Sequence, residues 1–198
     1  MSSSPLLLAS NSPRRRELLL CLGVAFQVCP QDIDESVLDG EKPYDYVQRV
    51  ALEKAQSALA AHPDGLVLAA DTSVIVDDRI LGKPKDSADA AIMLALLSNR
   101  EHTVLTAITL ADSLRQRSSV VRTTVNFRAI SAAQIQQYWE TGEPVGKAGA
   151  YAIQGFGSAF VESIEGSFSN VVGLPLFETA QYLEEFKVAI WQQGLAGL

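Results

Sequence analysis

Histidine and cysteine are scarce in this 198-residue chain, which has two of each. Cys21 and Cys29 lack CxxC spacing and are expected to be reduced thiols, so no disulfide framework is expected. His62 and His102 have no partner at metal-ligand spacing, which argues against a zinc site. Two isolated histidines, with no G-x-S-x-G sequence, also give little support for a serine triad. Any metal is therefore expected to be a hard cation bound by oxygen.

Excess basic charge and long apolar runs are missing as well. Lys and Arg number 16 against 23 Asp and Glu, for a net charge of -7 and a pI near 4.8. That balance argues against nonspecific nucleic-acid binding, which relies on basic patches. No apolar run approaches the roughly 20 residues of a membrane span, and residues 1–9 lack the features of a signal peptide. We therefore expect no nucleic-acid partner, no membrane association and a cytoplasmic setting.

The pattern of elements predicts an α/β fold. With 47% hydrophobic residues and no internal repeat, low-complexity segment or linker, residues 1–198 are expected to form a single domain with a sizeable core. Helical patterns follow Pro13, Pro43, Asp86, Ser131 and Pro175. Strand-like runs are Leu6–Ala9, Phe26–Cys29, Leu66–Ala70, Ser73–Val76, Val104–Ala111, Ser118–Phe127 and Ala159–Ile164. Helices interspersed with strands indicate a mixed, twisted sheet with flanking helices.

Two pairs of strands are expected to be hairpins. The sequence "VIVDDRIL" predicts a tight turn through Asp77–Asp78. The long runs Val104–Ala111 and Ser118–Phe127 predict an antiparallel ribbon.

Three consecutive arginines stand at the start of the first predicted helix. In "LLLASNSPRRRELL", Ser12 suits the N-cap and Pro13 the first helical position. Cations there oppose the helix dipole, at roughly 0.3–1 kcal/mol each when exposed. A phosphate at the Ser10-Asn11-Ser12 turn would instead make ligands of these arginines, because guanidinium matches phosphate oxygens. The alternative is a solvated basic face, and one arginine can face solvent in either case.

Lys54 is anomalous because it falls on the apolar side of its predicted helix. Arg49, Glu53, Gln56 and Ser57 share the polar side, and steps of about 100° per residue place Lys54 opposite them. A buried lysine needs a counter-charge. Either its stem packs while its amine reaches water, or it points into a cleft.

Acidic residues form two further candidates. Asp71 and Thr72 end the apolar run "LVLAA", and strand ends in α/β proteins often carry site residues. The Asp71 carboxylate could bind Mg²⁺ or accept a proton from water, or could simply cap a turn. Asp32, Asp34 and Glu35 form an acidic loop that is either solvated or supplies a second metal oxygen.

Several glycine-rich stretches do not match nucleotide-binding motifs. "GEPVGKAGA" is one residue short of a Walker A loop and lacks Ser or Thr after Lys147. "GFGSAF" has no third glycine for a dinucleotide fingerprint. The chain is therefore neither a P-loop NTPase nor a Rossmann dehydrogenase.

Three stretches together resemble the Maf nucleotide pyrophosphatases. They are "LASNSPRRREL", "AADTSVIVDDRILGKPKD" and "KAGAYAIQGFGSAFVESIEGSFSNVVGLPL", and the resemblance spans nearly the whole chain. "IQG" at Ile153-Gln154-Gly155 resembles the branch that hydrolyses dTTP and UTP. The resemblance implies two lobes around a cleft, as in inosine-triphosphate pyrophosphatases. It also implies cleavage between the α and β phosphates, giving a nucleoside monophosphate and pyrophosphate.

The resemblance also implies roles for particular residues. Asp71 matches the proposed general base, and Glu35 matches a loop acid that helps Asp71 hold a divalent metal, Mg²⁺ or Mn²⁺. The positions that contact phosphate are Ser10, Arg14, Arg15, Lys54 and Lys83. The positions tied to base selection are Arg14, Thr72 and Gln154. Alone, Lys83 in "LGKPKD" would be an ordinary turn lysine.

One position departs from the family pattern. Many members have an acid before the lysine of "KAGAY", where this chain has Gly146. The rate or the metal preference could differ for that reason, although the reaction is expected to be the same.

Chemistry supports a pyrimidine substrate. The Gln154 amide offers one acceptor and two donors, which match the O4 acceptor and N3–H donor of uracil or thymine. Cytosine reverses that pattern, although a flipped amide would accept it. A pocket discriminates weakly against the one methyl group that separates thymine from uracil, so both dTTP and UTP are expected substrates.

Other functions remain open at the sequence level. One is a house-cleaning enzyme for modified pyrimidine nucleotides, and another is a non-catalytic nucleotide-binding regulator of cell division. A homodimer is left open as well.

Overall fold

The computed structural model describes residues 5–192, and the chain divides into two compact units. Unit 1 comprises Met1–Asp71, Thr106–Val121 and Gly173–Leu198, and unit 2 comprises Thr72–Leu105 and Arg122–Val172. Three long strands contribute residues to both units.

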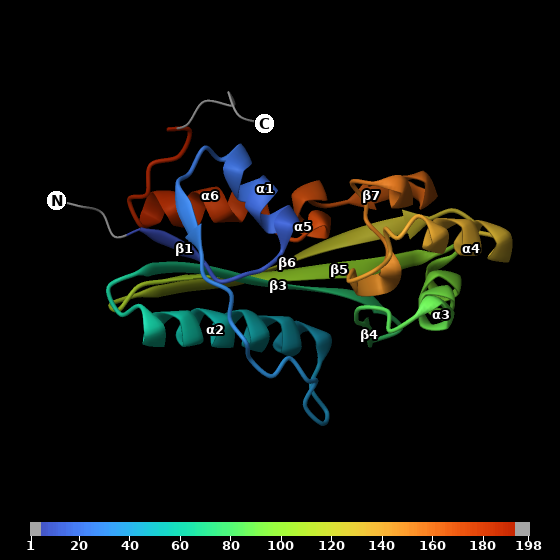
Figure 1. Ribbon diagram of the computed structural model, residues 1–198, viewed down its shortest axis with the longest axis horizontal. Coiled ribbons are helices and arrows are strands. Elements are labelled where there is room, and N and C mark those ends of the chain that lie inside the picture. Colours follow the sequence, from blue (N-terminus) through green and yellow to red (C-terminus); the bar gives the residue numbers. More distant parts are fainter. Residues whose placement is uncertain (1–4, 193–198) are drawn as a thin grey trace. The chain divides into compact units, whose positions relative to one another are not determined.

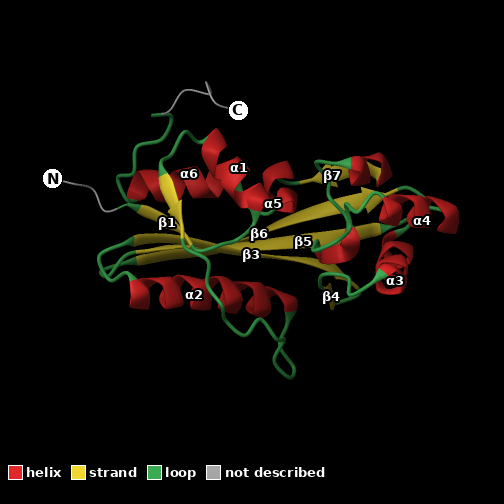
Figure 2. Ribbon diagram, viewed as in Figure 1, coloured by secondary structure: helices red, strands yellow, loops and turns green. Residues whose placement is uncertain are grey.

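The described residues form seven strands hydrogen-bonded in the order β2-β1-β3-β5-β6-β7, with β4 paired to β3 (Figures 1 and 2). The strands are β1 (Leu6–Leu8), β2 (Phe26–Val28), β3 (Leu66–Val76), β4 (Arg79–Leu81), β5 (Glu101–Ala111), β6 (Gln116–Phe127) and β7 (Val161–Glu165). The helices are α1 (Pro13–Cys21), α2 (Pro43–Ala61), α3 (Ser87–Leu97), α4 (Ala132–Glu140), α5 (Phe168–Val172) and α6 (Leu176–Glu185), with the 3-10 turns η1 (Ala148–Ala150) and η2 (Phe156–Phe160).

Unit 1 is organised around the short parallel strand β1. It pairs with β2 on one side and with β3 on the other, so that Leu7 aligns with Gln27 and with Val67. Strands buried on both faces have continuous apolar sequences, which explains why β1 and the first half of β3 contain no polar residue before Asp71.

Alternate side chains of these strands fill two cores. Leu6, Leu8 and Leu68 pack with residues of α1 and α6 such as Leu19 and Leu183. The intervening side chains of β1 and β3 pack on the other face, against Ala55 and Ala58 of α2. Figure 1 shows α2 on one side of the strands and α1 and α6 on the other. The side chain of Asp71 continues the set that points to the α2 face, because side chains of a strand alternate.

Unit 2 contains the expected tight hairpin, which joins β3 to β4. Asp77 and Asp78 have φ of 50° and 58°, as a two-residue turn with the right-handed twist of its strands requires. Strand β3 is longer than the sequence indicates, because Leu66–Ala70 and Ser73–Val76 form one continuous strand through Asp71 and Thr72.

The core of unit 2 is aromatic. His102, Phe127 and Tyr151 make edge-to-face contacts, and Nε2 of His102 lies 2.8 Å from the Tyr151 hydroxyl. Helix α4 follows Ser131 as expected, begins at a capping box formed by Ser131 and Gln134 and lies beside α3 (Figure 2).

The predicted fold class is confirmed, since a mixed sheet with flanking helices is present. The cleft and the single domain stay predictions. Within residues 5–192, every helix is too short or too polar to cross a bilayer.

Candidate active site

The turn after β1 folds Arg15 back into unit 1. Ser12 caps α1, with its hydroxyl 3.5 Å from the Arg15 amide. The Arg15 side chain donates from Nη1 to the Ser10 hydroxyl at 3.1 Å and from Nε to the Gly173 carbonyl at 2.8 Å. Ser10 and Arg15, both predicted to contact phosphate, therefore lie together.

The other two arginines of this turn differ in their surroundings. Burial lowers the pKa of Arg14, although Glu17 opposes the effect. Arg16 donates to the Asn11 carbonyl at 3.3 Å in an exposed contact. The three consecutive arginines thus differ in environment. This agrees with the expectation that one of them can face solvent.

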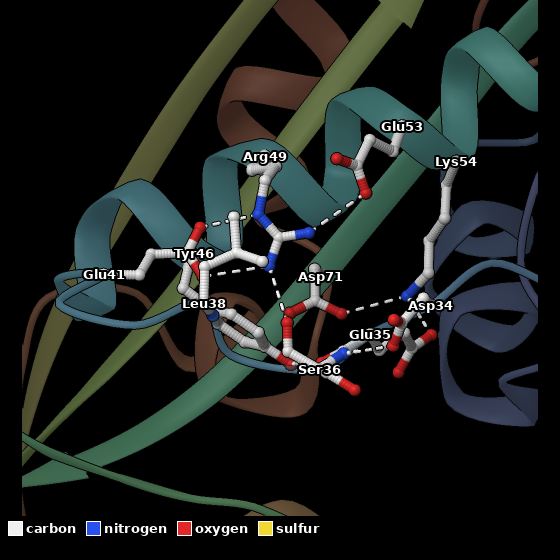
Figure 3. A network of polar contacts seen from close by, with 10 residues as sticks. All are labelled: Asp34, Glu35, Ser36, Leu38, Glu41, Tyr46, Arg49, Glu53, Lys54 and Asp71. Atoms are coloured by element: carbon white, nitrogen blue, oxygen red, sulfur yellow. Dashed lines mark hydrogen bonds and ion pairs between the residues drawn. The ribbon is translucent and has the colours of Figure 1, made fainter.

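Lys54 is buried and held by two carboxylates. Its side chain comes from the inner face of α2 and is only 9% exposed. The ammonium Nζ lies 3.0 Å from Oδ1 of Asp71 and 2.7 Å from Oε1 of Glu35 (Figure 3). The amine does not reach into open water, and the counter-charges that the sequence called for are Asp71 and Glu35.

Asp71 is a buried carboxyl group among cations. Burial raises its pKa, while the charges of Lys54 and Arg15 lower it and that of Glu35 raises it again. A carboxylate with increased proton affinity in an electropositive setting is suited to act as a general base.

The loop that carries Glu35 is tied down by two residues of α2. The Tyr46 hydroxyl donates to the Glu35 carbonyl at 2.9 Å. Arg49 donates to both carboxylate oxygens of Glu41, at 2.6 and 2.9 Å, and to the Ser36 carbonyl at 2.9 Å (Figure 3). Burial, followed by the charges of Asp71 and Glu35, raises the pKa of Tyr46 to about 12, so its hydroxyl stays a donor.

Tyr46 and Arg49 had no role predicted from the sequence. Arg49 was placed correctly on the polar side of the helix, but the spacing of charges does not reveal a partner eight residues earlier. The available signal in the sequence was that Arg49 follows the acidic loop of Asp32, Asp34 and Glu35 by a short stretch of chain.

The carboxylates of Asp71 and Glu35 fit a divalent cation. Both approach the same positive centre, the Lys54 ammonium, and both supply the oxygen ligands that Mg²⁺ and Mn²⁺ prefer. Residues 5–192 contain no cluster of three or more His, Cys, Asp or Glu side chains that could hold a metal alone. Remaining ligands would have to come from water and phosphate, as is usual for Mg²⁺.

Three predicted site residues belong to unit 2. Thr72 is half-buried in β3, Lys83 is exposed after β4, and Gln154 is exposed between η1 and η2. The Gly149 amide donates to the Gly82 carbonyl at 3.1 Å, which links the Lys83 turn to the segment before Gln154. That these residues share a site with Asp71 stays a prediction.

Unit 1 thus contains a basic side chain at a helix start, a buried lysine and a buried acid, the arrangement of a protein that handles polyanions within an α/β fold. The chain belongs to the Maf family: the family described as "Maf-like protein" matches residues 5–186.

Curated relatives cover most of the chain. The dTTP/UTP pyrophosphatase of Vibrio parahaemolyticus is 52% identical over 185 residues, which are 93% of this chain and 98% of the relative. The dTTP/UTP pyrophosphatase of Anaeromyxobacter dehalogenans is 55% identical over 182 residues, covering 90% and 92%. Among solved structures, the Ham1 protein of Staphylococcus aureus aligns with a TM-score of 0.45 at 15% identity, over 63% of this chain and 72% of that chain.

Proposed function

We propose that this chain is a nucleoside triphosphate pyrophosphatase that converts dTTP and UTP to the nucleoside monophosphate and pyrophosphate. The observation that carries the proposal is the buried Asp71 carboxylate held by Lys54, in a chain about half identical to dTTP/UTP pyrophosphatases. A triphosphate carries several negative charges, so its hydrolysis depends on positioning and charge neutralisation.

The start of α1 and the cationic side chains bind the phosphates in this proposal. Ser10 lies in the turn before α1, and Arg14 and Arg15 lie in the first turn of that helix, where the positive end of the helix dipole favours an anion. Lys54 and Lys83 add positive charge. These groups hold the triphosphate and oppose the charge that builds up on the leaving pyrophosphate.

Asp71 is the proposed general base. It accepts a proton from the attacking water, whose oxygen bonds to the α-phosphorus as the bond to the bridging oxygen breaks. The electron pair leaves with pyrophosphate, so one water is consumed per nucleotide. A dedicated general acid is unnecessary, because bound cations stabilise the leaving group.

A divalent cation, Mg²⁺ or Mn²⁺, is proposed at Asp71 and Glu35. When bound, it would supply positive charge and acidify water. Base selection is assigned to Gln154, Arg14 and Thr72. A cytoplasmic location and a homodimer stay predictions.

A panel of nucleotides assayed for pyrophosphate release, with and without Mg²⁺ or Mn²⁺, tests the proposal. We expect release from dTTP and UTP, and a loss of roughly 10²–10³-fold in Asp71→Asn. Asp64→Asn, at an exposed turn before β3, is the matched control and should keep full activity.

The same panel distinguishes the alternatives. Binding without pyrophosphate release would instead support a nucleotide-binding regulator. Faster turnover of modified pyrimidine nucleotides would support a house-cleaning role.

A further inference from the structure

The segment that carries Gln154 has little structure of its own. Ile153-Gln154-Gly155 lies in a turn between η1 and η2, outside any strand or α-helix. The Gln154 side chain is exposed and makes no hydrogen bond to the part of the chain that the structure describes. A glutamine that reads a base must be held in place through its backbone, because its side chain has to remain free for the ligand.

Glu143 supplies that support from a neighbouring segment. Its Oε2 accepts from the Phe156 amide at 2.9 Å, and its Oε1 accepts from the Gly157 amide at 2.9 Å. These are the first two N–H groups of η2. The N-cap residue of η2 is Gly155, which has no side chain to bind them. One carboxylate therefore fixes the backbone two and three residues after Gln154.

Tyr138 extends the support to the other side of Gln154. Its hydroxyl donates to Oε1 of Glu143 at 2.7 Å and accepts from the Ala152 amide at 3.1 Å. Glu143 and Tyr138 thus hold residues on both sides of Gln154, from Ala152 to Gly157.

Glycine at position 155 lets the carboxylate come this close. A Cβ at Gly155 would lie 2.0 Å from Oε2 of Glu143, so any larger residue would displace the carboxylate or the turn. The glycine of "IQG" is therefore needed for contact with Glu143.

The carboxylate stays ionised in this position. Burial raises the pKa of Glu143, but hydrogen bonds from Tyr138, Gly157 and Phe156, with the charge of Lys147, lower it by more. Charge-assisted hydrogen bonds of this kind are about twice as strong as neutral ones.

We infer that Glu143 is a positioning residue that sets the selectivity for uracil and thymine over cytosine, by fixing the backbone on which Gln154 stands. The inference rests on the proposed function. It also gives a role to "GEPVGKAGA", the stretch that fails as a Walker A loop.

The ratio of kcat/KM for UTP to that for CTP tests this role. A misplacement of about 1 Å costs about 100-fold, so the ratio should fall by about 100-fold in Glu143→Ala. Tyr138→Phe keeps the ring that packs on Phe160 and loses only the hydroxyl, so the fall should be about tenfold or less. A merely structural role would reduce the active fraction, which lowers both kcat/KM values equally and leaves their ratio unchanged.

Two comparisons complete the experiment. Glu140→Gln removes a carboxylate from α4, the helix of Tyr138; within residues 5–192 that carboxylate accepts a hydrogen bond from Gln136 alone, so the ratio should be unchanged. In a Gln154→Ala background, adding Glu143→Ala should change the ratio less than about twofold, because Glu143 affects selectivity only through the position of the Gln154 side chain.

Failure of the inference is distinguishable from failure of the proposed function. If the wild-type protein releases no pyrophosphate from UTP, the function itself is wrong. If it prefers UTP to CTP and either Glu143→Ala or Gln154→Ala keeps that preference, the function stands and the positioning role is overturned.

Discussion

Lys54 contacts both acids of the candidate site, Asp71 and Glu35. Its removal should show how far activity depends on this shared cation. Lys54→Met leaves Asp71 and Glu35 without their shared cation, which lies 3.0 and 2.7 Å from them. We expect pyrophosphate release to fall by roughly 10²–10³-fold. The pKa of Asp71, which Lys54 lowers, should rise further, so the acidic limb of the pH–rate profile should move to higher pH. Lys42→Met, at the exposed start of the same helix, is the control, and an unmoved acidic limb would contradict the pairing.

His102 should make the stability of the protein depend on pH. Burial, with a smaller effect of Arg100, lowers the pKa of His102 from 6.5 to about 4. Between pH 6.5 and about 4, His102 therefore binds a proton in the unfolded state and not in the folded state. The free energy of unfolding falls as the pH falls through this range. Over that window the loss is about 3 kcal/mol. Urea unfolding of wild type and His102→Gln, compared at pH 4.5 and 7.5, measures it: the wild type should lose more than the variant, and an equal loss would refute the assignment.

At the scale of elements, α2 holds the acidic loop in place through Arg49. Arg49→Ala removes its contacts to Glu41 and Ser36. The contacts are partly exposed, so we expect a stability loss of only about 1 kcal/mol. Hydrogen exchange at Leu38, whose amide donates to Glu41 at 3.0 Å, should quicken markedly, and pyrophosphate release should fall as Glu35 loosens.

Glu53→Gln is the matched control for this loop. Glu53 contacts Arg49 at 3.1 Å from the helix side, so its substitution weakens an ion pair of the same arginine without releasing the loop. Unchanged exchange at Leu38 in Arg49→Ala would show that the loop is held by other contacts.

Local chemistry explains which elements were predictable. Pro13 and Pro43 begin helices as expected, and the Asp77–Asp78 turn forms the predicted hairpin. The break expected at Asp71 is absent, because β3 continues through this residue and Lys54 compensates its buried charge. Helical periodicity was enough to single out Lys54, since its period places the residue on a buried face.

The contacts that hold loops could not be predicted in the same way. Arg49 reaches Glu41, and Glu143 reaches Phe156, across turns whose path only the folded chain defines. Sequence spacing identifies the side chains that do chemistry, whereas the residues that position them depend on tertiary structure.

For the molecule as a whole, a net charge of -7 makes a polyanionic substrate improbable unless cations are concentrated locally. Asp71→Asn separates binding from turnover, because it removes the proposed base and keeps the arginines and lysines. A ligand at 100 times its Kd stabilises the folded state by about 2.7 kcal/mol, and each kcal/mol raises the Tm of a protein of this size by about 2–4 °C. Saturating UTP should therefore raise the Tm of Asp71→Asn by about 5–10 °C, with a smaller shift for CTP at the same concentration. Calorimetry measures the shift and also tests the single-domain prediction, which requires one transition; no shift with UTP would mean that the cationic side chains do not form a triphosphate site.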